Sequence, residues 1–473
     1  MQHHIPFFAT TAWAEHDHFF CRNPHSCAYG HGNLPRPRPD SKMIGIRHED
    51  RRTHAWLVGK TGMGKSTLLQ NLAVWDLRYS HGLAVIDPNG DLVESLLDFV
   101  PRTRSGDVVY FDPSDLDWPI GLNILTSVDR DARHLVADQV ISVFKHFWGD
   151  SWGPRLENIL RYSLMALLEV EGSTLLGLHR LLTDSAYRAW VVEQVRDPQV
   201  TRFWTYEFAS EHAKLQQESI APVLNKVGAF LASPLMRNIL GQSHAKIDMG
   251  FMMDHGRIFL ANLSKGKIGE QNSALLGTLL ITKFYLAAMG RASLPQAQRR
   301  DFFLTIDEAH NVATTVFGPM LSEARKYRLN LTIANQYVEQ LSPEIRSALL
   351  GNVGTLIAFR LGSTDAYHLA REFEPTISAQ DLEALGRHEM ALKLAINGLS
   401  SDPFRATAML PFTPAATEDN RANILKSSRK KYGVRREIVE DRIARWLASS
   451  KPIRHEKHTA SAKPQARSSS WWK

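Results

Sequence analysis

A glycine-rich segment that ends in lysine and serine is the part of this sequence best suited to chemistry. It fits the pattern G-x-x-x-x-G-K-[ST] in full. The glycines allow successive backbone N–H groups to face phosphates, a lysine supplies positive charge, and a hydroxyl can bind Mg²⁺. An ordinary glycine-rich turn is the alternative, which the strand expected before the segment and the helix expected after it disfavour. We predict that ATP binds at Gly59, Lys60, Thr61, Gly62, Met63, Gly64, Lys65, Ser66 and Thr67.

Two adjacent carboxylates follow an apolar run and supply what the phosphate loop lacks. Phe302–Ile306 leads into Asp307 and Glu308. We expect Asp307 to lie beside Mg²⁺ together with Ser66, and Glu308 to act as the general base on the attacking water. Such acidic pairs also occur by chance, and the phosphate loop favours the functional interpretation. Asp307-Glu308-Ala309-His310 spells a motif of a helicase superfamily, but we find no other motif of that superfamily in this sequence. We therefore predict no function for His310.

Two further polar residues lie where hydrolysis would need them. Gln336 ends the apolar run Leu331–Ala334 after one asparagine, where it can sense the γ-phosphate or orient water, or merely cap the strand. Arg325 is expected on a helix between this run and the carboxylate strand. It can point at the γ-phosphate of a neighbouring subunit, or it can be an ordinary solvated side chain.

The elements that must position these residues follow a strand–helix alternation. Short apolar runs alternate with helical periodicity, which predicts a largely parallel sheet covered by helices on both faces, an α/β fold. From Asp131 to about Arg237 the pattern is almost entirely helical, which indicates an inserted all-α domain. Regular structure is expected to begin at Ala55. The runs expected as strands are Ala55–Val58, Leu83–Ile86, Val108–Phe111, Ile258–Ala261, Phe302–Ile306, Leu331–Ala334 and Thr355–Phe359, with a closing hairpin around Asn397-Gly398.

Length and composition indicate a globular protein of more than one domain. The chain has 473 residues, of which 44% are hydrophobic and 22% charged. The longest apolar stretch, around Ala274–Met289, is too short for a membrane span and contains Lys283. The N-terminus lacks the basic region of a secretory signal, and two cysteines make no disulfide framework, so a cytoplasmic location is expected.

Positive charge is concentrated at the C-terminus. Residues 411–473 carry 15 Lys/Arg and 6 Asp/Glu, a net charge of +9, whereas the whole chain has +7. A solvated tail and a contact with nucleic acid or an acidic partner are both open. The Trp471-Trp472 pair beside it can stack on bases, dock to a partner or remain exposed.

The N-terminal region contains a second cluster with ligand chemistry. Two imidazoles and two thiolates suit a tetrahedral zinc site, although the Cys-x5-Cys spacing is wider than usual. A flexible His-rich tail is the alternative. The four candidate zinc ligands are His18, Cys21, Cys27 and His31.

The motifs, taken in order, resemble the HerA–FtsK superfamily of DNA-pumping ATPases, and most closely the TraG/TraD-type coupling proteins of conjugative type IV secretion. The resemblance covers about residues 43 to 410. It rests on the phosphate loop with Met63, Ile86–Leu92, Gly121–Leu125, Ser151–Arg155, Ile258–Gly269, Asp307-Glu308, Glu323–Lys326, Asn335-Gln336 with Gln340-Leu341, and Gly351–Gly354.

The resemblance implies a RecA-like P-loop NTPase domain with an all-α insertion, assembled as a homo-hexamer around DNA. It implies that Arg325 is the arginine finger and Gln336 the sensor glutamine, with Arg155 as the next candidate finger. Membrane-anchored coupling proteins begin with transmembrane helices, which we do not find here. The predicted organisation is an N-terminal extension (1–42), the RecA-like domain (43–126 and 250–412), the insertion (127–249) and a basic C-terminal segment (413–473) that is disordered after about residue 450.

These observations predict an ATP-driven, DNA-stimulated translocase of a conjugative or mobile-element transfer system, with ATP and Mg²⁺ as cofactors and DNA, single- or double-stranded, as substrate. Its partner would be a relaxase, a nuclease or a membrane channel, and any association with the inner membrane would come through that partner. A HerA-like translocase in DNA processing or defence is one alternative. A DNA-binding scaffold that uses ATP only for assembly is another, which the intact Lys65 and Glu308 disfavour.

Overall fold

A computed structural model describes residues 4–10, 42–126, 130–149, 152–314, 316–414 and 420–449. Its centre is a sheet of eleven strands in the order β2-β1-β13-β10-β9-β3-β8-β7-β4-β6-β5. The strands from β9 to β5 in this order are parallel, and the others pair antiparallel. This sheet with its covering helices is called the sheet domain below.

The strands predicted from apolar runs are all present, and the α/β prediction is confirmed. They are β3 (Ala55–Val58), β4 (Gly82–Asp87), β5 (Val108–Phe111), β6 (Ile258–Asn262), β7 (Phe302–Ile306), β8 (Leu329–Asn335) and β9 (Thr355–Ala358). The predicted closing hairpin is also present. β10 (Glu389–Lys393) pairs with β13 (Phe404–Ala408), and the short strands β11 (Ala395–Ile396) and β12 (Leu399–Ser400) flank Asn397-Gly398.

The expectation that regular structure begins at Ala55 is wrong. β1 (His4–Thr10) and β2 (Lys42–Arg47) precede it and extend the antiparallel end of the sheet. β1 pairs with β13, almost 400 residues later in the chain, so its place depends on long-range pairing. The described part of the N-terminal extension therefore belongs to the sheet.

Helices cover both faces of the sheet, as the alternation of side chains along β3 requires. Leu57 packs on one face with the core of α1 and α2, whereas Trp56 and Val58 pack on the other with α12 to α15. The helices are α1 (Lys65–Arg78), α2 (Asp91–Leu96), α10 (Met249–Asp254), α11 (Lys265–Ile268), α12 (Glu270–Gly290), α13 (Phe317–Glu323), α14 (Pro343–Asn352), α15 (Ser363–Phe373) and α16 (Ala379–Ala384).

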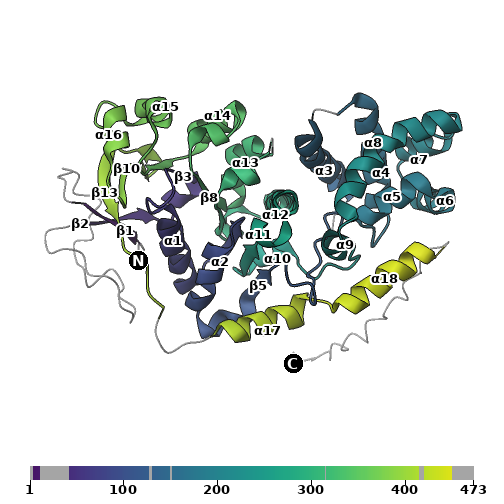
Figure 1. The fold of residues 1–473 in the computed structure, drawn as a ribbon, viewed down its shortest axis with the longest axis horizontal. Helices are drawn as coiled ribbons and strands as arrows, with labels where there is room; N and C mark the ends of the chain where they lie inside the picture. Colours follow the sequence, from purple (N-terminus) through teal and green to yellow (C-terminus); the bar gives the residue numbers. More distant parts are fainter. Residues whose placement is uncertain are drawn as a thin grey trace, which may run out of the picture.

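The helical insertion forms a bundle beside the sheet domain (Figure 1). This all-α domain comprises α3 (Arg133–Trp148), α4 (Pro154–Leu168), α5 (Leu175–Thr183), α6 (Ser185–Gln194), α7 (Pro198–Arg202), α8 (Ala213–Leu231) and α9 (Pro234–Leu240). Its apolar side chains join the same hydrophobic core as one face of the sheet. The two domains are therefore packed together rather than linked only by the chain.

Helix α12 lies between the two domains (Figure 1). The expectation that the apolar stretch around this helix is too short for a membrane span is wrong. Among the described residues, Glu270–Ser293 is long and apolar enough to span a membrane, and 67% of its most apolar window is buried in the protein. A bent pair, Lys214–Leu231 with Pro234–Leu240, passes the same test only if it is counted as one span. Lys283 of α12 donates to the carbonyl of Asn123, and burial lowers its pKa to about 8.

Two C-terminal helices, α17 (Arg421–Tyr432) and α18 (Arg436–Ala448), run along both domains (Figure 1) and are called the C-terminal strap below. On the sheet domain, Ile424 is buried and the Ser428 hydroxyl accepts a hydrogen bond from the backbone N–H of Tyr110 at 2.9 Å. This contact satisfies an N–H on the free edge of β5. On the all-α domain, Arg180 donates to the carbonyl of Trp446 at 2.6 Å. Much of the predicted basic segment is thus folded.

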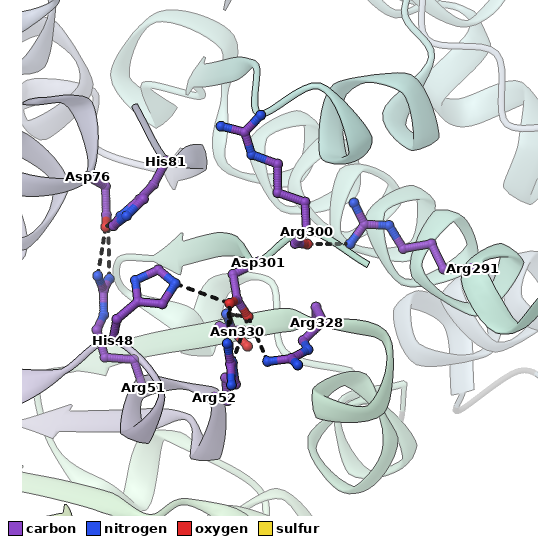
Figure 2. Close-up of polar contacts among 10 residues, drawn as sticks. All are labelled: His48, Arg51, Arg52, Asp76, His81, Arg291, Arg300, Asp301, Arg328 and Asn330. Atoms are coloured by element: carbon purple, nitrogen blue, oxygen red, sulfur yellow. Dashed lines mark hydrogen bonds and ion pairs between the residues drawn. The ribbon is translucent and has the colours of Figure 1, made fainter. Parts of the chain in front are cut away.

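A charged cluster holds the amino-terminal edge of the parallel strands (Figure 2). The carboxylate of Asp301, just before β7, contacts His48 at 3.1 Å, Arg52 at 2.8 Å and Asn330 at 3.1 Å. Burial alone would raise the pKa of Asp301, but the hydrogen bonds of His48 and Arg52 hold that pKa well below its usual range. This cluster joins the connections before β3, β7 and β8, at the end opposite the phosphate loop.

Candidate active site

The predicted phosphate loop lies at the carboxyl end of β3 and leads into α1. Gly62 and Gly64 have φ values of 77° and 119°, which side chains rarely adopt. A Cβ at Gly59 would lie 2.5 Å from Cβ of Phe359, and one at Gly64 would lie 2.7 Å from Nδ1 of His388. The loop therefore requires glycine for its curvature and for close packing against the end of β9.

Lys65 is buried, with 6% of its surface exposed. Its ammonium donates to the carbonyl oxygens of Gly59 and, at 3.3 Å, of Lys60. Burial lowers the pKa of Lys65, and the nearby Glu308 and Asp307 act in the opposite direction. The charge thus points into the loop, where a phosphate would replace the carbonyl oxygens as its partner. Thr61 and Ser66 are exposed and Thr67 is half-buried around it.

Asp307 directly follows β7 and lies next to Asp87, which ends the neighbouring strand β4. Burial, together with the charges of Asp87 and Glu308, raises the pKa of Asp307 to about 7. Asp87 accepts hydrogen bonds from the backbone of Asn89 and Leu92, both at 2.9 Å, and so caps α2. A divalent cation would relieve this repulsion, so the residues fit the predicted Mg²⁺, which Asp307 and Ser66 would hold. The proximity of Asp87 was not predicted.

Strand β8 lies between β3 and β7, and this order brings the polar residues together. Val58 pairs with Asn335, and Ile306 with Ile333, so Gln336 follows β8 at the level where the loop and the carboxylates begin. Nε2 of Gln336 donates to Oε1 of Glu308 at 2.9 Å. The predicted sensor and the predicted base are therefore in direct contact.

Two neighbouring residues affect this geometry: Asn335 through its side-chain hydrogen bonds, and Glu308 through its backbone conformation. The side chain of Asn335 accepts from Nε1 of Trp56 at 2.5 Å and donates to the carbonyl of Tyr337 at 2.6 Å, so it is a structural group. Glu308 has a φ of 44°, a strained conformation for a residue with a side chain. Strain at a residue whose side chain faces Lys65 and Gln336 is typical of a functional position.

His310 and Gln340 also reach this site. Nδ1 of His310 lies 3.5 Å from Oε2 of Glu308, and its Nε2 lies 3.3 Å from Nε2 of Gln340. Oε1 of Gln340 accepts from the backbone N–H groups of Gln336 and Tyr337, both at 3.1 Å. In the sequence, the one sign of this role is the place of His310 two residues after Glu308.

Arg325 does not belong to the site of its own chain. It is exposed in the short 3-10 helix Ala324–Tyr327, just before the amino end of β8, whereas Gln336 follows the carboxyl end. Seven residues of strand separate the two ends by about 20 Å. Arg155, the other candidate finger, is half exposed in the all-α domain and pairs with Glu211 at 2.7 Å.

The four candidate zinc ligands, His18, Cys21, Cys27 and His31, and the Trp471-Trp472 pair lie outside the described residues. Among the residues that the structure describes, no group of three or more His, Cys, Asp or Glu side chains is arranged to hold a metal ion.

The sequence matches no protein-family model and no curated protein. The fold, however, is similar to that of the bacterial conjugative coupling protein TrwB, with a TM-score of 0.57 at 16% identity over 79% of this chain and 89% of that one. It is also similar to VirB4 of Thermoanaerobacter pseudethanolicus, with a TM-score of 0.53 at 15% identity over 81% of this chain and 97% of that one. The chain has a RecA-like P-loop NTPase fold.

The fold expected from the sequence, a RecA-like P-loop NTPase domain, is therefore the fold observed. TrwB structures with this fold contain the GTP analogue GDPNP, or ADP with Mg²⁺. The matched regions cover most of both chains, so the likeness includes more than the phosphate loop.

Proposed function

We propose that this protein is an ATP-driven DNA translocase, a coupling ATPase of a conjugative or mobile-element DNA-transfer system. The observation that carries the proposal is the convergence of Lys65, Asp307, Glu308 and Gln336 at one edge of the sheet. The likeness to the conjugative coupling protein TrwB supports the biological setting.

Each of these residues would have a separate role in ATP hydrolysis. Lys65 neutralises the phosphates, Glu308 takes a proton from the attacking water, and the side-chain amide of Gln336 holds the Glu308 carboxylate. The water oxygen bonds to the γ-phosphorus, the bond to the bridging oxygen breaks, and ADP leaves with inorganic phosphate. Mg²⁺ bound with ATP would neutralise phosphate charge, with Ser66 and Asp307 on its protein side.

A ring of identical subunits, most simply a homo-hexamer, would complete the site. Arg325 lies at the edge of the sheet opposite its own phosphate loop, and it is exposed. A head-to-tail ring could place this edge of one subunit against the phosphate-loop edge of the next. Arg325 then acts on the neighbour's ATP, and single subunits hydrolyse slowly.

DNA and protein partners would engage the all-α domain and the basic C-terminal residues. The catalytic residues named above come from the sheet domain, which leaves the surface of the all-α domain free for substrate. A relaxase, a nuclease or a membrane channel is the class of partner that such a motor serves, and a partner that co-purifies would separate conjugative transfer from DNA processing.

The test is the steady-state ATPase rate without DNA, with single-stranded DNA and with duplex DNA, measured alongside native mass. We expect DNA to raise the rate and the active species to be a ring. An ATPase rate that neither form of DNA changes, in assembled protein, would contradict the translocase proposal and favour a scaffold.

A further inference from the structure

The carboxylate of Glu308 belongs to a closed ring of side-chain contacts. The other members are Gln336, Gln340 and His310. Gln336 binds one carboxylate oxygen, Oε1, and His310 faces the other, Oε2. Gln340 joins the backbone of Gln336 to the imidazole of His310. Each member therefore contacts two others, and the ring connects the strand ends of β7 and β8.

The two groups that face each other across the longest contact of the ring have no hydrogen-bond partner among the described residues. Oε2 of Glu308 and Nδ1 of His310 are both buried, and neither makes a hydrogen bond within the described chain. They lie 3.5 Å apart, slightly beyond a normal hydrogen bond. Because buried polar groups are nearly always paired, each is the natural partner of the other, and such bonds commonly shorten when substrate arrives.

The ring also determines which nitrogen of His310 carries the proton. Oε1 of Gln340 accepts from two backbone N–H groups, at Gln336 and Tyr337, so the amide cannot be reversed without losing both bonds. Its Nε2, which can only donate, therefore faces Nε2 of His310. That imidazole nitrogen must accept, which leaves the proton of the neutral ring on Nδ1, directed at Glu308.

A charged His310 does not fit this arrangement. An imidazolium would present an N–H at Nε2 to the NH₂ group of Gln340, and two donors would face each other. Burial lowers the pKa of His310, while Glu308 raises it and Lys265 of α11 lowers it. The other ionisable groups that face it are Glu270 of α12, and His146 and Glu344, which line the same pocket.

We propose that His310 is a positioning residue that donates a neutral hydrogen bond from Nδ1 to Glu308 and, through Gln340, fixes the base relative to Gln336. This inference rests on the proposed ATPase function. A neutral donor orients the carboxylate without adding a positive charge, which would weaken Glu308 as a base. Gln340 sets the tautomer and is the link between the sensor strand and the imidazole.

Three substitutions at His310 separate positioning from simple packing. Asn places an amide N–H where Nδ1–H lies, Gln places one near Nε2, and Ala removes both. We expect His310→Ala and His310→Gln to lower kcat about 10- to 100-fold, the range seen when an outer-shell partner is lost. ATP affinity should stay within about 2-fold, and His310→Asn should restore most of the rate. His179→Asn, at an exposed histidine of α5, is the matched control.

A double-mutant cycle tests the tautomer. Gln340→Glu keeps an oxygen for the two backbone donors and turns an acceptor toward Nε2 of His310, which reverses the required proton position. We expect kcat to fall about 10-fold in the wild-type background. In the His310→Asn background, where no atom occupies the Nε2 position, the same change should have little effect on kcat.

The result is read from ATP turnover, ATP affinity and melting temperature of wild type, Glu308→Gln and these variants. If the wild type does not hydrolyse ATP, the proposed function itself fails. If the wild type is active and Glu308→Gln is not, a full rate for His310→Ala would overturn only the positioning role. Equal losses for His310→Asn and His310→Ala, with normal ATP affinity, would overturn it as well. If His310→Ala does not fold, the comparison of kcat between His310→Asn and His310→Gln still tests the positioning role, and equal losses in the two would overturn it.

Discussion

Nε2 of Gln336 and Oε1 of Glu308 lie 2.9 Å apart, although the two residues follow different strands, β8 and β7. The contact exists because β8 is inserted between the phosphate-loop strand and the carboxylate strand. A γ-phosphate that moved Gln336 would therefore also move Glu308, the proposed base. This geometry makes Gln336 the most informative residue to change outside the phosphate loop.

Gln336→Ala should lower kcat about 10-fold or more and leave ATP binding nearly unchanged, because it removes a contact made to the base rather than to the phosphates. Asn335→Ala is the matched control. Its side chain holds Trp56 and Tyr337, so we expect a lower melting temperature without a specific loss of turnover. A normal kcat for Gln336→Ala would remove this residue from the mechanism.

The raised pKa of Asp307, about 7, predicts a pH-dependent stability. The folded state binds a proton more tightly than the unfolded state, so wild-type stability decreases as pH rises from about 4 through 7. Asp307→Asn should therefore raise the melting temperature of the nucleotide-free protein at pH 8, by an amount that shrinks toward pH 5. Asp98→Asn, at an exposed site, should leave the melting temperature nearly unchanged at both pH values. Identical profiles for wild type and Asp307→Asn would show that the carboxyl group is not destabilised by its surroundings.

Arg325→Ala should bind ATP and assemble normally yet hydrolyse slowly, since a finger in related phosphoryl transfers contributes roughly 10³–10⁵ in rate. Mixing it with Lys65→Ala should restore part of the activity, because each variant keeps the half-site that the other lacks. Subunit exchange is checked by energy transfer between labelled subunits, and Lys326→Ala is the neighbouring control. Mixed rings that remain inactive would rule out action in trans.

Two truncations distinguish the role of the basic residues after Ser449, called the basic tail here, from the role of the C-terminal strap. Ending the chain after Ser449 removes six Lys/Arg and one Asp/Glu, and we expect an unchanged melting temperature with weaker, less salt-dependent DNA binding. Ending it after Pro414 also removes α17 and α18, which exposes the edge of β5 and the surface under Trp446, so stability should fall. Replacing the six basic residues with Gln tests charge alone. Unchanged binding at low and high salt would mean that the tail does not contact DNA.

The strands and the catalytic carboxylates were predictable because each depends on local sequence. Phe302–Ile306 is an apolar run of strand length, and Asp307 and Glu308 follow it directly. The phosphate loop is defined by glycines within eight residues. The alternation of these strands with helices then restricts the possible folds to a few of the α/β class.

The remaining features depend on contacts between distant segments, which local patterns do not encode. β1 pairs with a strand almost 400 residues away. The role of His310 depends on Gln340, which β8 and the turn after it bring beside the imidazole. The C-terminal strap has the composition of a solvated basic tail. It is fixed to the two domains by burial of residues such as Ile424 and Ile443 and by hydrogen bonds to distant segments.

The most direct test of the account is a single-turnover measurement of ATP hydrolysis by wild type, Lys65→Ala and Glu308→Gln, with ATP affinity measured in parallel. Lys65→Ala should fail to bind ATP, because it removes the buried ammonium that points into the phosphate loop. Glu308→Gln should bind ATP with wild-type affinity and cleave it roughly 10²–10⁴-fold more slowly, the contribution expected of a general base. Near-wild-type cleavage by Glu308→Gln would contradict the assignment of the base, and with it the mechanism proposed for this site.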